Sequence, residues 1–443
     1  MENQSSTKQL KQCLGFVDLL STSIGQIIGA GIMTLLGASI GLTGRSIPFA
    51  LIISAVLVIG YTIPMIIIPG TLRVRGGQYT MVAMLAGKKL TGVFLIIYIM
   101  SNVSLAMYAI SFASYFMDFF GFGNAQLVAF GLLTVFFLIN VVGVDVMADF
   151  QNIIVLLLCA ALALLAVFGA PQIQSDYFTN GFLTHGVSGL FQAAGLMTFA
   201  LGGAFVLVNL SAEAKNPTRD IPLAMIVSTL FVAVLYAGVA FVAAGVFPVE
   251  QVAGQNLSIV ARKVLSGPLF AFFMVCGAMF ALISTLNAQY AWATKPILQA
   301  CDDGWLPRWM AYLHPKFKTP IVLLIILYVL GVVCVFTGLD VSVLGNLSLI
   351  SSMLTFLLVS VFMGKLPKIA PQAWQKSKYH MSDSLLNFMV VYSSIASIIV
   401  IYLNAIQLSM PLIIGNVIIV IAAFVFALLR DKYVNMDISY EEV

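Results

Sequence analysis

Long runs of apolar residues, separated by short polar connections, dominate the chain. The runs stay apolar for about 18 residues or more, which is long enough for a helix to cross a bilayer, whereas membrane-spanning strands are shorter and alternate. The pattern predicts twelve transmembrane helices, at residues 16–42, 46–70, 91–120, 125–143, 149–170, 188–214, 222–247, 264–300, 320–338, 342–364, 387–408 and 411–430. We therefore expect an all-α integral membrane protein.

Two of these apolar runs are interrupted by glycines. The first contains Gly25, Gly29 and Gly31, and the second contains Gly202 and Gly203. A glycine inside a helix costs about 1 kcal/mol relative to alanine, and irregular backbone at membrane depth occurs only where it is buried or lines a cavity. Paired interruptions in the two halves of a chain point to a transporter's binding site. The alternative is that the glycines only let helices pack closely.

The two interrupted runs stand first in two successive sets of five predicted helices. This placement indicates a 5+5 inverted repeat with discontinuous helices 1 and 6. The expected organisation is an N-terminal segment at 1–15, a first repeat at 16–170, a second repeat at 188–364, two further helices at 387–430 and a tail at 431–443.

Composition narrows the class of protein further. Hydrophobic residues make up 61% of the chain and charged residues only 9%, whereas about a quarter of the residues are charged in a soluble domain. The lipid bilayer is therefore an expected partner, and no nucleic acid is expected. Lysine and arginine are concentrated in the connections on the side of the N-terminus, which predicts cytoplasmic termini in a plasma membrane. The sequence does not predict an oligomeric state.

Three short motifs then carry a resemblance to a known family. They are Ile-Gly-Ala-Gly-Ile-Met at 28–33, Glu-Ala-Lys-Asn-Pro at 213–217, and Lys295 followed by Asp-Asp-Gly-Trp-Leu-Pro at 302–307. From about Leu14 to Pro320 the chain resembles the amino acid, polyamine and organocation transporter superfamily, whose fold is that of the bacterial leucine transporter. Ala30, Met33 and Ala214 depart from the family's motifs. The resemblance implies an amino acid permease with two helices added after the repeats.

The interrupted helices suggest how a zwitterion could be bound without a charged side chain. A half-helix that begins near Gly29 to Gly31 presents free amides to a carboxylate, and carbonyls near Gly202 can accept hydrogen bonds from an ammonium group. The resemblance implies the same assignment, with the amine reaching carbonyls of both interruptions. The candidate substrate-binding residues are Ile28, Gly29, Ala30, Gly31, Phe199, Gly202 and Gly203.

The resemblance also implies gates and a class of cargo. Phe199 matches the family's gating aromatic, with a core aromatic as the alternative, and Glu213 with Lys295 is expected to form an inner-gate contact. Relatives that exchange cationic substrates carry a glutamate where this chain has Phe205. An intramembrane charge is costly and usually functional. The absence of this glutamate therefore predicts an apolar pocket and a neutral amino acid as cargo.

The coupling ion is left open by the sequence. Leu158 stands where proton-coupled and exchanging relatives often have a lysine. Ala281, Ser284 and Thr285 place one carbonyl and two hydroxyls on one helical turn. The resemblance implies that carbonyls of Gly25 and Ile28 complete a sodium site of five oxygens, which suits a hard cation. The alternative is that both hydroxyls bond back to their own helix. We expect no other cofactor.

Together these features predict a secondary active transporter that moves a neutral amino acid by alternating access, with sodium as a candidate coupling ion. The alternatives are a proton-coupled or exchange transporter, including one for cationic amino acids or polyamines, and a sensor that binds an amino acid without transporting it. An enzyme is not expected, because apart from Lys295 and Glu213 the predicted helices offer no positioned acid, base or nucleophile.

Overall fold

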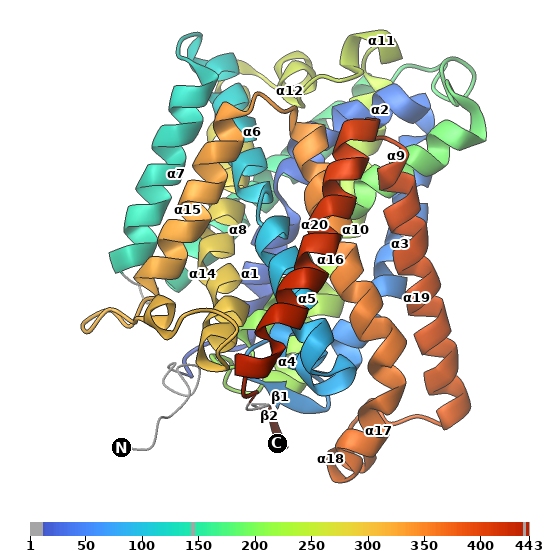
Figure 1. Ribbon diagram of the computed structural model, residues 1–443. Helices are drawn as coiled ribbons and strands as arrows, with labels where there is room; N and C mark the ends of the chain where they lie inside the picture. The colour runs from blue at the N-terminus through green and yellow to red at the C-terminus, as the bar shows by residue number, and fades with distance from the viewer. Residues whose placement is uncertain (1–11, 143–146, 437–439, 443) are drawn as a thin grey trace.

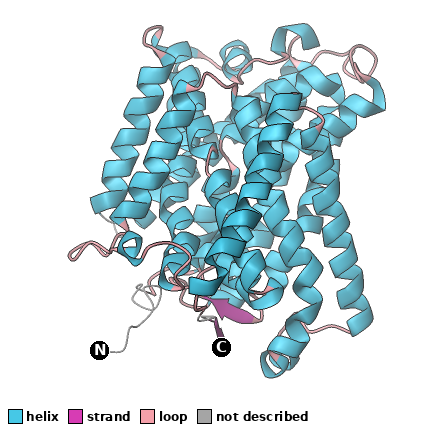
Figure 2. Cartoon of the chain, in the orientation of Figure 1, coloured by secondary structure: helices cyan, strands magenta, loops and turns pink. Residues whose placement is uncertain are grey.

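The computed structural model describes residues 12–142, 147–436 and 440–442. It is a bundle of helices joined by short connections (Figures 1 and 2). Residues 1–11 of the expected N-terminal segment, with Lys8 and Lys11, lie outside the described residues. So do residues 143–146, where a predicted helix was to end, and residues 437–439 and 443 of the expected tail.

Each of the twelve predicted ranges coincides with one helix or with a helix broken into parts. In chain order the parts are α1 (Phe16–Ile27), η2 (Gly31–Leu35) and α2 (Leu36–Thr43); α3 (Ile47–Ile67); α5 (Lys88–Ser101) and α6 (Ser104–Phe120); α7 (Ala125–Val142); α8 (Met147–Gly169); α9 (Gly186–Leu201) and η5 (Gly202–Leu210); α10 (Pro217–Gly245); α13 (Gly267–Phe272), η6 (Phe273–Met279) and α14 (Phe280–Asp302); α15 (Ile321–Phe336); α16 (Val341–Phe362); α19 (Asp383–Ala405); and α20 (Met410–Arg430).

Shorter elements lie in the connections between these helices. They are η3 (Gly44–Ser46), β1 (Leu72–Val74), α4 (Gln78–Ala86), η4 (Ala170–Gln172), α11 (Val249–Val252), α12 (Ser258–Val264), η7 (Arg308–Ala311), η8 (Met363–Lys365), α17 (Leu366–Ile369), α18 (Pro371–Lys376), η9 (Asp431–Tyr433) and β2 (Tyr440–Glu442).

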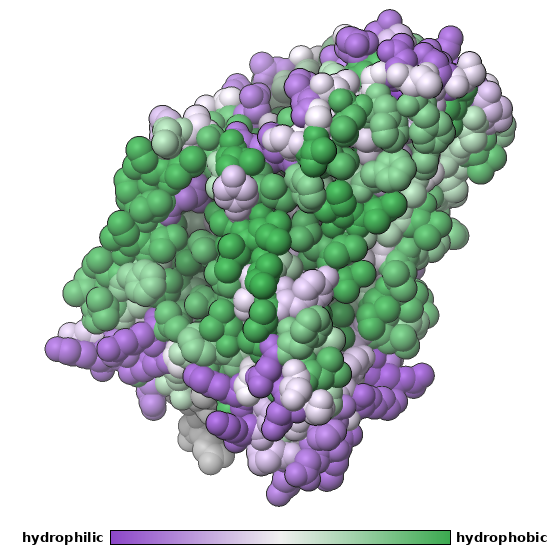
Figure 3. Space-filling view, turned by 90° about the vertical axis from the view of Figure 1, so that its right-hand side faces the viewer, coloured by the Kyte–Doolittle hydropathy of each residue, from purple (hydrophilic) through white to green (hydrophobic). Residues whose placement is uncertain are grey.

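The length and apolar character of the helices fit a bilayer. Within the described residues, ten helical stretches are long and apolar enough to cross a membrane, and α15 is a shorter apolar helix. A broad hydrophobic band covers the middle of the face shown in Figure 3, and hydrophilic residues gather at its two ends. Apolar side chains such as Phe388, Ile414 and Phe424 are exposed on α19 and α20, as expected where lipid replaces water. The protein is therefore a multi-pass membrane protein; the count of twelve crossings and the inverted repeat remain predictions.

Segments from distant parts of the chain meet at the lower end of Figure 1, where β1 and β2 lie. The two strands pair antiparallel, with Arg73 opposite Glu441, and Arg75 forms an ion pair with Glu441. The amide of Leu14 donates to the carbonyl of Glu213 at 3.0 Å, and a guanidinium nitrogen of Arg73 lies 3.2 Å from the carbonyl of Lys215. Hence the first and last described segments lie on the same side of the bundle, as an even number of crossings requires.

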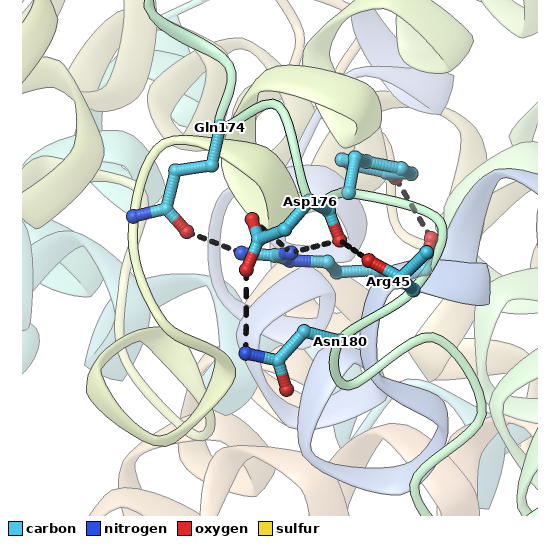
Figure 4. A network of polar contacts seen from close by, with 6 residues as sticks. Arg45, Gln174, Asp176 and Asn180 are labelled. Atoms are coloured by element: carbon cyan, nitrogen blue, oxygen red, sulfur yellow. Dashed lines mark hydrogen bonds and ion pairs between the residues drawn. The ribbon is translucent and has the colours of Figure 1, made fainter.

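At the other end of the bundle, a buried arginine ties the corner between α2 and α3 to the connection between α8 and α9 (Figure 4). Arg45 is 2% exposed, and its Nη1 lies 2.9 Å from both the carbonyl and the Oδ1 of Asp176. Gln174 accepts from Nη2, and the Tyr177 hydroxyl donates to the Arg45 carbonyl at 2.7 Å. The hydrogen bond from Arg45 lowers the pKa of Asp176 below its ordinary value, so the pair stays charged. The contact lies directly after α2, the last part of the first interrupted helix.

Candidate substrate cavity and cation site

The first predicted interruption lies at residues 28–30, between α1 and η2. The last hydrogen bond of α1 runs from the amide of Ile28 to the carbonyl of Ile24 at 2.8 Å, and Ile28 then takes an extended conformation with φ −83° and ψ 93°. The chain resumes as the π-helix η2. A helix that stops in this way leaves its last four carbonyls without intrahelical partners.

Side-chain hydroxyls from other helices bond to three of those four carbonyls. Tyr236 on α10 donates to Ile27 O at 3.0 Å, and Thr285 on α14 lies 2.8 Å from Gly25 O and 3.3 Å from Ile28 O. The fourth carbonyl, that of Gln26, accepts no hydrogen bond within the described residues. It lies against Gly203, where an added Cβ would come within 2.7 Å of Gln26 O.

The second predicted interruption lies at the junction of α9 and η5. The α-helix ends at Leu201, and the chain continues without opening as a 3-10 helix that begins at Gly202. A change from α to 3-10 pairing shifts the acceptor of each amide by one residue, so that one carbonyl at the junction loses its amide partner. Near this junction the Tyr61 hydroxyl lies 3.4 Å from Thr198 O. The second segment is thus tightened, whereas the first is opened.

The two interruptions pack directly against each other. A Cβ added at Gly31 would lie 2.6 Å from the Cβ of Ala200. One added at Gly203 would lie 2.8 Å from the main chain of Gln26 and Ile27. Close approach of the two backbones therefore requires glycine at both positions.

A central cavity lies beside this contact. Its lining residues come from both interrupted segments and from α3, α4, α5, α6, α14 and α16; they are Gln26, Tyr61, Gln78, Tyr98, Ser101, Ser104, Tyr108, Thr198, Phe199, Gly202, Gly203, Phe205, Val206, Gln289, Trp292, Ser348, Leu349, Ser352 and Thr355. None of these residues carries a charge. Any cargo bound here must therefore balance its own charges or find partners among main-chain dipoles.

The cavity includes some of the predicted binding residues and not others. Phe199, Gly202 and Gly203 line it, and the ring of Phe199 lies 6.4 Å from that of Tyr108. The stretch Ile28–Gly31 is buried beside the cavity and is not among its lining residues. In that stretch, Gly29 packs on Thr285 and Gly31 on Ala200.

The predicted inner-gate pair is in contact. The Lys295 Nζ lies 2.8 Å from the Glu213 Oε1, and both side chains are largely buried, with 7% and 14% of their surface exposed. Glu213 also belongs to the segment that holds Leu14 through its carbonyl. The pair therefore joins α14 to the end of the second interrupted segment, near the end of the bundle that carries β1 and β2.

The five predicted cation ligands are also together. We call them the oxygen cluster: the carbonyl oxygens of Gly25, Ile28 and Ala281 and the hydroxyl oxygens of Ser284 and Thr285. Ser284 Oγ lies 3.0 Å from Ala281 O and 3.3 Å from Gly25 O, and Thr285 Oγ1 lies 2.8 Å from both of these carbonyls. Each hydroxyl therefore reaches its own helix and also α1, and the ion itself stays a prediction.

The oxygen cluster suits a cation. Each hydroxyl has a single hydrogen to donate, so Ser284 and Thr285 supply two hydrogens to three carbonyl oxygens. The remaining lone pairs make the cluster electron-rich, and several converging oxygens are what a hard cation prefers. Beside it, Gln151 on α8 is buried, and its Nε2 has no hydrogen-bond partner among the residues that the structure describes. Leu158 is also fully buried on α8.

The pocket was expected to be apolar, and most of its lining surface is apolar, although serine, threonine, glutamine and tyrosine supply many of the lining residues. The structure also adds one feature. The helix predicted at 91–120 is broken at Asn102–Val103, between α5 and α6, where Leu105 N donates to Asn102 O at 3.1 Å. We call this the third interruption. Its signal in the sequence is the polar cluster Ser-Asn-Val-Ser within an apolar run.

Known proteins resemble this chain over most of its length. A family model described as amino acid permease matches residues 14–429. The branched-chain amino acid permease BcaP of Bacillus subtilis is 25% identical over 343 residues, which cover 72% of this chain and 73% of the relative. From the same organism, the methylthioribose transporter is 27% identical over 72% of this chain and 73% of its own length. The serine/threonine exchanger SteT is 26% identical over 70% and 73%, respectively.

Proposed function

Because the chain belongs to the amino acid permease family, we propose that it is a secondary active transporter that moves a neutral amino acid across the plasma membrane by alternating access. Family membership makes it an amino acid transporter and not an enzyme. One observation supports the finer proposal: the central cavity is bounded by interrupted helices and lined only by uncharged residues.

The uncharged lining favours a cargo without net charge. A cationic side chain would lose its hydration in this cavity and find no carboxylate there. Phe205, at the position where the family resemblance placed a glutamate for cationic exchange, lines the cavity and packs edge-on against Phe356 with ring centroids 4.8 Å apart. An amino acid with a neutral side chain brings one positive and one negative group, which main-chain dipoles can bind.

Main-chain groups near the two interruptions are the proposed partners of that zwitterion. The carbonyl of Gln26, without a donor in the described chain, lies at the contact with Gly203 and can accept from the ammonium group. In this proposal the amides that follow the first interruption, near Gly31, receive the carboxylate. These amides would reach the carboxylate of the cargo only when Gly31 separates from Ala200. That separation is a relative movement of the two interrupted helices of the kind that alternating access requires.

We also propose that sodium drives this transport. Gly25, Ile28, Ala281, Ser284 and Thr285 would hold the ion through oxygen atoms, and the negative ends of the buried carbonyl dipoles at the end of α1 would attract its positive charge. Gly25 directly precedes Gln26, and Ile28 follows Gln26 by two residues. The ion would therefore stabilise the same stretch at the end of α1 that contacts the cavity. Proton coupling and exchange remain the alternatives to this ion.

The test is uptake of radiolabelled neutral amino acids into liposomes that contain the purified protein, with and without an inward sodium gradient. Saturable uptake supports transport and excludes a sensor that only binds. A sodium gradient that leaves uptake unchanged would contradict sodium coupling, and uptake that requires an amino acid inside the liposome would identify an exchanger.

A double variant tests the ion site itself. Ser284→Ala with Thr285→Ala removes two of the five oxygens, so the half-saturating sodium concentration is expected to rise at least about tenfold, the equivalent of 1.4 kcal/mol. Ser397→Ala is a matched control, because its buried hydroxyl on α19 donates to its own helix at 2.9 Å, to Ser393 O. An unchanged sodium dependence in the double variant would favour hydroxyls that only bond to α14.

A further inference from the structure

One wall of the central cavity is a fixed network of hydrogen bonds. From this network we infer that the cargo is an amino acid with an uncharged side chain that forms hydrogen bonds through a hydroxyl or an amide group. This inference rests on the proposed function, since it specifies which neutral amino acids the transporter carries. The wall is made by the third interruption and by α14 and α16, whereas the proposed zwitterion partners belong to the first and second interruptions.

The network centres on Gln289 of α14, which is 1% exposed. Its Nε2 donates to the side chains of Asn102, at 2.9 Å, and Ser104, at 2.8 Å. The Ser104 hydroxyl lies 3.1 Å from the Gln289 Oε1. Because both amide hydrogens of Gln289 are used, the orientation of the amide is fixed, and the spare lone pairs of Oε1 and of Ser104 Oγ remain as acceptors.

The third interruption adds a main-chain acceptor to the same wall. In a continuous helix the Leu105 amide would bond to Ser101 O, but here it donates to Asn102 O. Ser101 O instead accepts from the hydroxyl of Ser348 on α16, at 2.6 Å. At this turn the amides bond three residues back instead of four, and because the stretch contains neither glycine nor proline, we attribute the change to the side chains of the wall that bond to it.

Two hydroxyls of α16 complete the wall as free donors. Ser352 and Thr355 line the cavity, and within the described part of the chain neither hydroxyl donates a hydrogen bond. A hydroxyl can rotate to donate or to accept. The wall thus offers fixed acceptors and two adjustable hydroxyls, which an aliphatic cargo side chain would leave unpaired in a buried site.

The charge of the wall restricts the cargo further. Acceptors alone would also suit an ammonium or guanidinium group, but within the described parts of the chain no carboxylate lines the cavity to replace the water that such a group loses. Serine, threonine, asparagine, glutamine and tyrosine are amino acids whose side chains donate and accept hydrogen bonds without carrying a charge.

The first test uses the wild-type protein and two pairs of competitors with nearly the same shape, threonine against valine and asparagine against leucine. Each competes with uptake of labelled threonine into liposomes. A site built to bond a hydroxyl strongly rejects an analogue that lacks it, so threonine and asparagine are each expected to inhibit at concentrations at least about tenfold lower than their apolar counterparts. Equal or better inhibition by valine and leucine would overturn the inference and leave the proposed function intact. Failure of every amino acid to be taken up would overturn the proposed function as well.

The second test removes the wall. Gln289→Met keeps the side-chain length but not the amide, and Ser104→Ala removes the hydroxyl that Gln289 contacts. The preference for threonine over valine is expected to fall to within about threefold in either variant. Gln407→Met and Ser54→Ala are matched controls, because their side chains bond to main-chain carbonyls outside the cavity and should keep the full preference. Size-exclusion chromatography shows whether the two wall variants are folded. If both are folded and still prefer threonine over valine as strongly as the wild type, the wall does not select the cargo.

Discussion

The first and second interruptions look alike in the sequence but differ in the structure. The first opens the backbone at Ile28, and hydroxyls of α10 and α14 cover most of the freed carbonyls. The second stays wound as a 3-10 helix, and Gly202 and Gly203 border the central cavity. Gly25 and Ile28 at the first interruption are thus the proposed cation ligands, Gln26 of the same interruption lines the cavity, and Gly202 and Gly203 at the second border the cavity proposed for the cargo. Breaking a helix in a membrane can create either kind of site, and the neighbouring helices determine which.

Gly203→Ala is expected to have the largest effect on stability, because it places a methyl group in the contact that joins the two interruptions. The added methyl would lie within 2.8 Å of main-chain atoms of Gln26 and Ile27, which cannot rotate away. Overpacking of this kind lowers the free energy of unfolding by about 3 kcal/mol. It should appear as a lower midpoint of thermal unfolding in detergent. Gly131→Ala, where nothing lies within 4 Å, should be neutral or stabilising. Equal midpoints for the two variants would contradict a tight contact.

Thr285→Val tests the first interruption and should cause the second-largest loss of stability. The variant keeps the shape of the side chain but leaves Ile28 O without its hydroxyl partner and Gly25 O with only the longer contact to Ser284, at a cost of about 2 kcal/mol. Thr285→Ser keeps the hydroxyl and should restore most of the stability in the same unfolding measurement. If serine is no better than valine, the methyl group of Thr285 and not its hydroxyl supports the interruption.

Tyr236→Phe removes one hydrogen bond to the first interruption, the 3.0 Å contact with Ile27 O. The expected loss is about 1 kcal/mol, typical for one buried hydrogen bond. Because Tyr236 does not line the cavity, the half-saturating concentration of the transported amino acid should stay unchanged. A change in that concentration without a loss of stability would show that this side of the interruption also faces the cargo.

Tyr61→Phe is the counterpart at the second interruption and should affect stability least. Its 3.4 Å contact with Thr198 O is long for a hydroxyl donor, so we expect a loss below about 0.5 kcal/mol. Tyr61 does line the cavity, and removal of its hydroxyl should therefore raise the half-saturating concentration of the amino acid in uptake measurements. The opposite result, lower stability with unchanged uptake, would reverse the comparison between the two interruptions.

The sequence by itself determined where the helices run and where two of them are disturbed. Apolar runs fix the segments that enter a bilayer, and the glycines at Gly29 and Gly202 weaken the helix where they stand, because both effects depend on residues close together in the chain. The grouping of Gly25, Ile28, Ala281, Ser284 and Thr285 could also be predicted, but only through the family resemblance, since no local pattern joins α1 to α14.

Tertiary structure alone decided what each disturbance does. The third interruption has no helix-breaking residue, and it persists because Gln289 and Ser348 reach it from other helices. The polar wall could not be predicted for the same reason: its serines, Asn102, Gln289 and Thr355 are scattered along the chain and meet only after the helices pack. A hydrogen bond needs both partners within about 3 Å, and the sequence names the partners without saying which of them the fold brings that close.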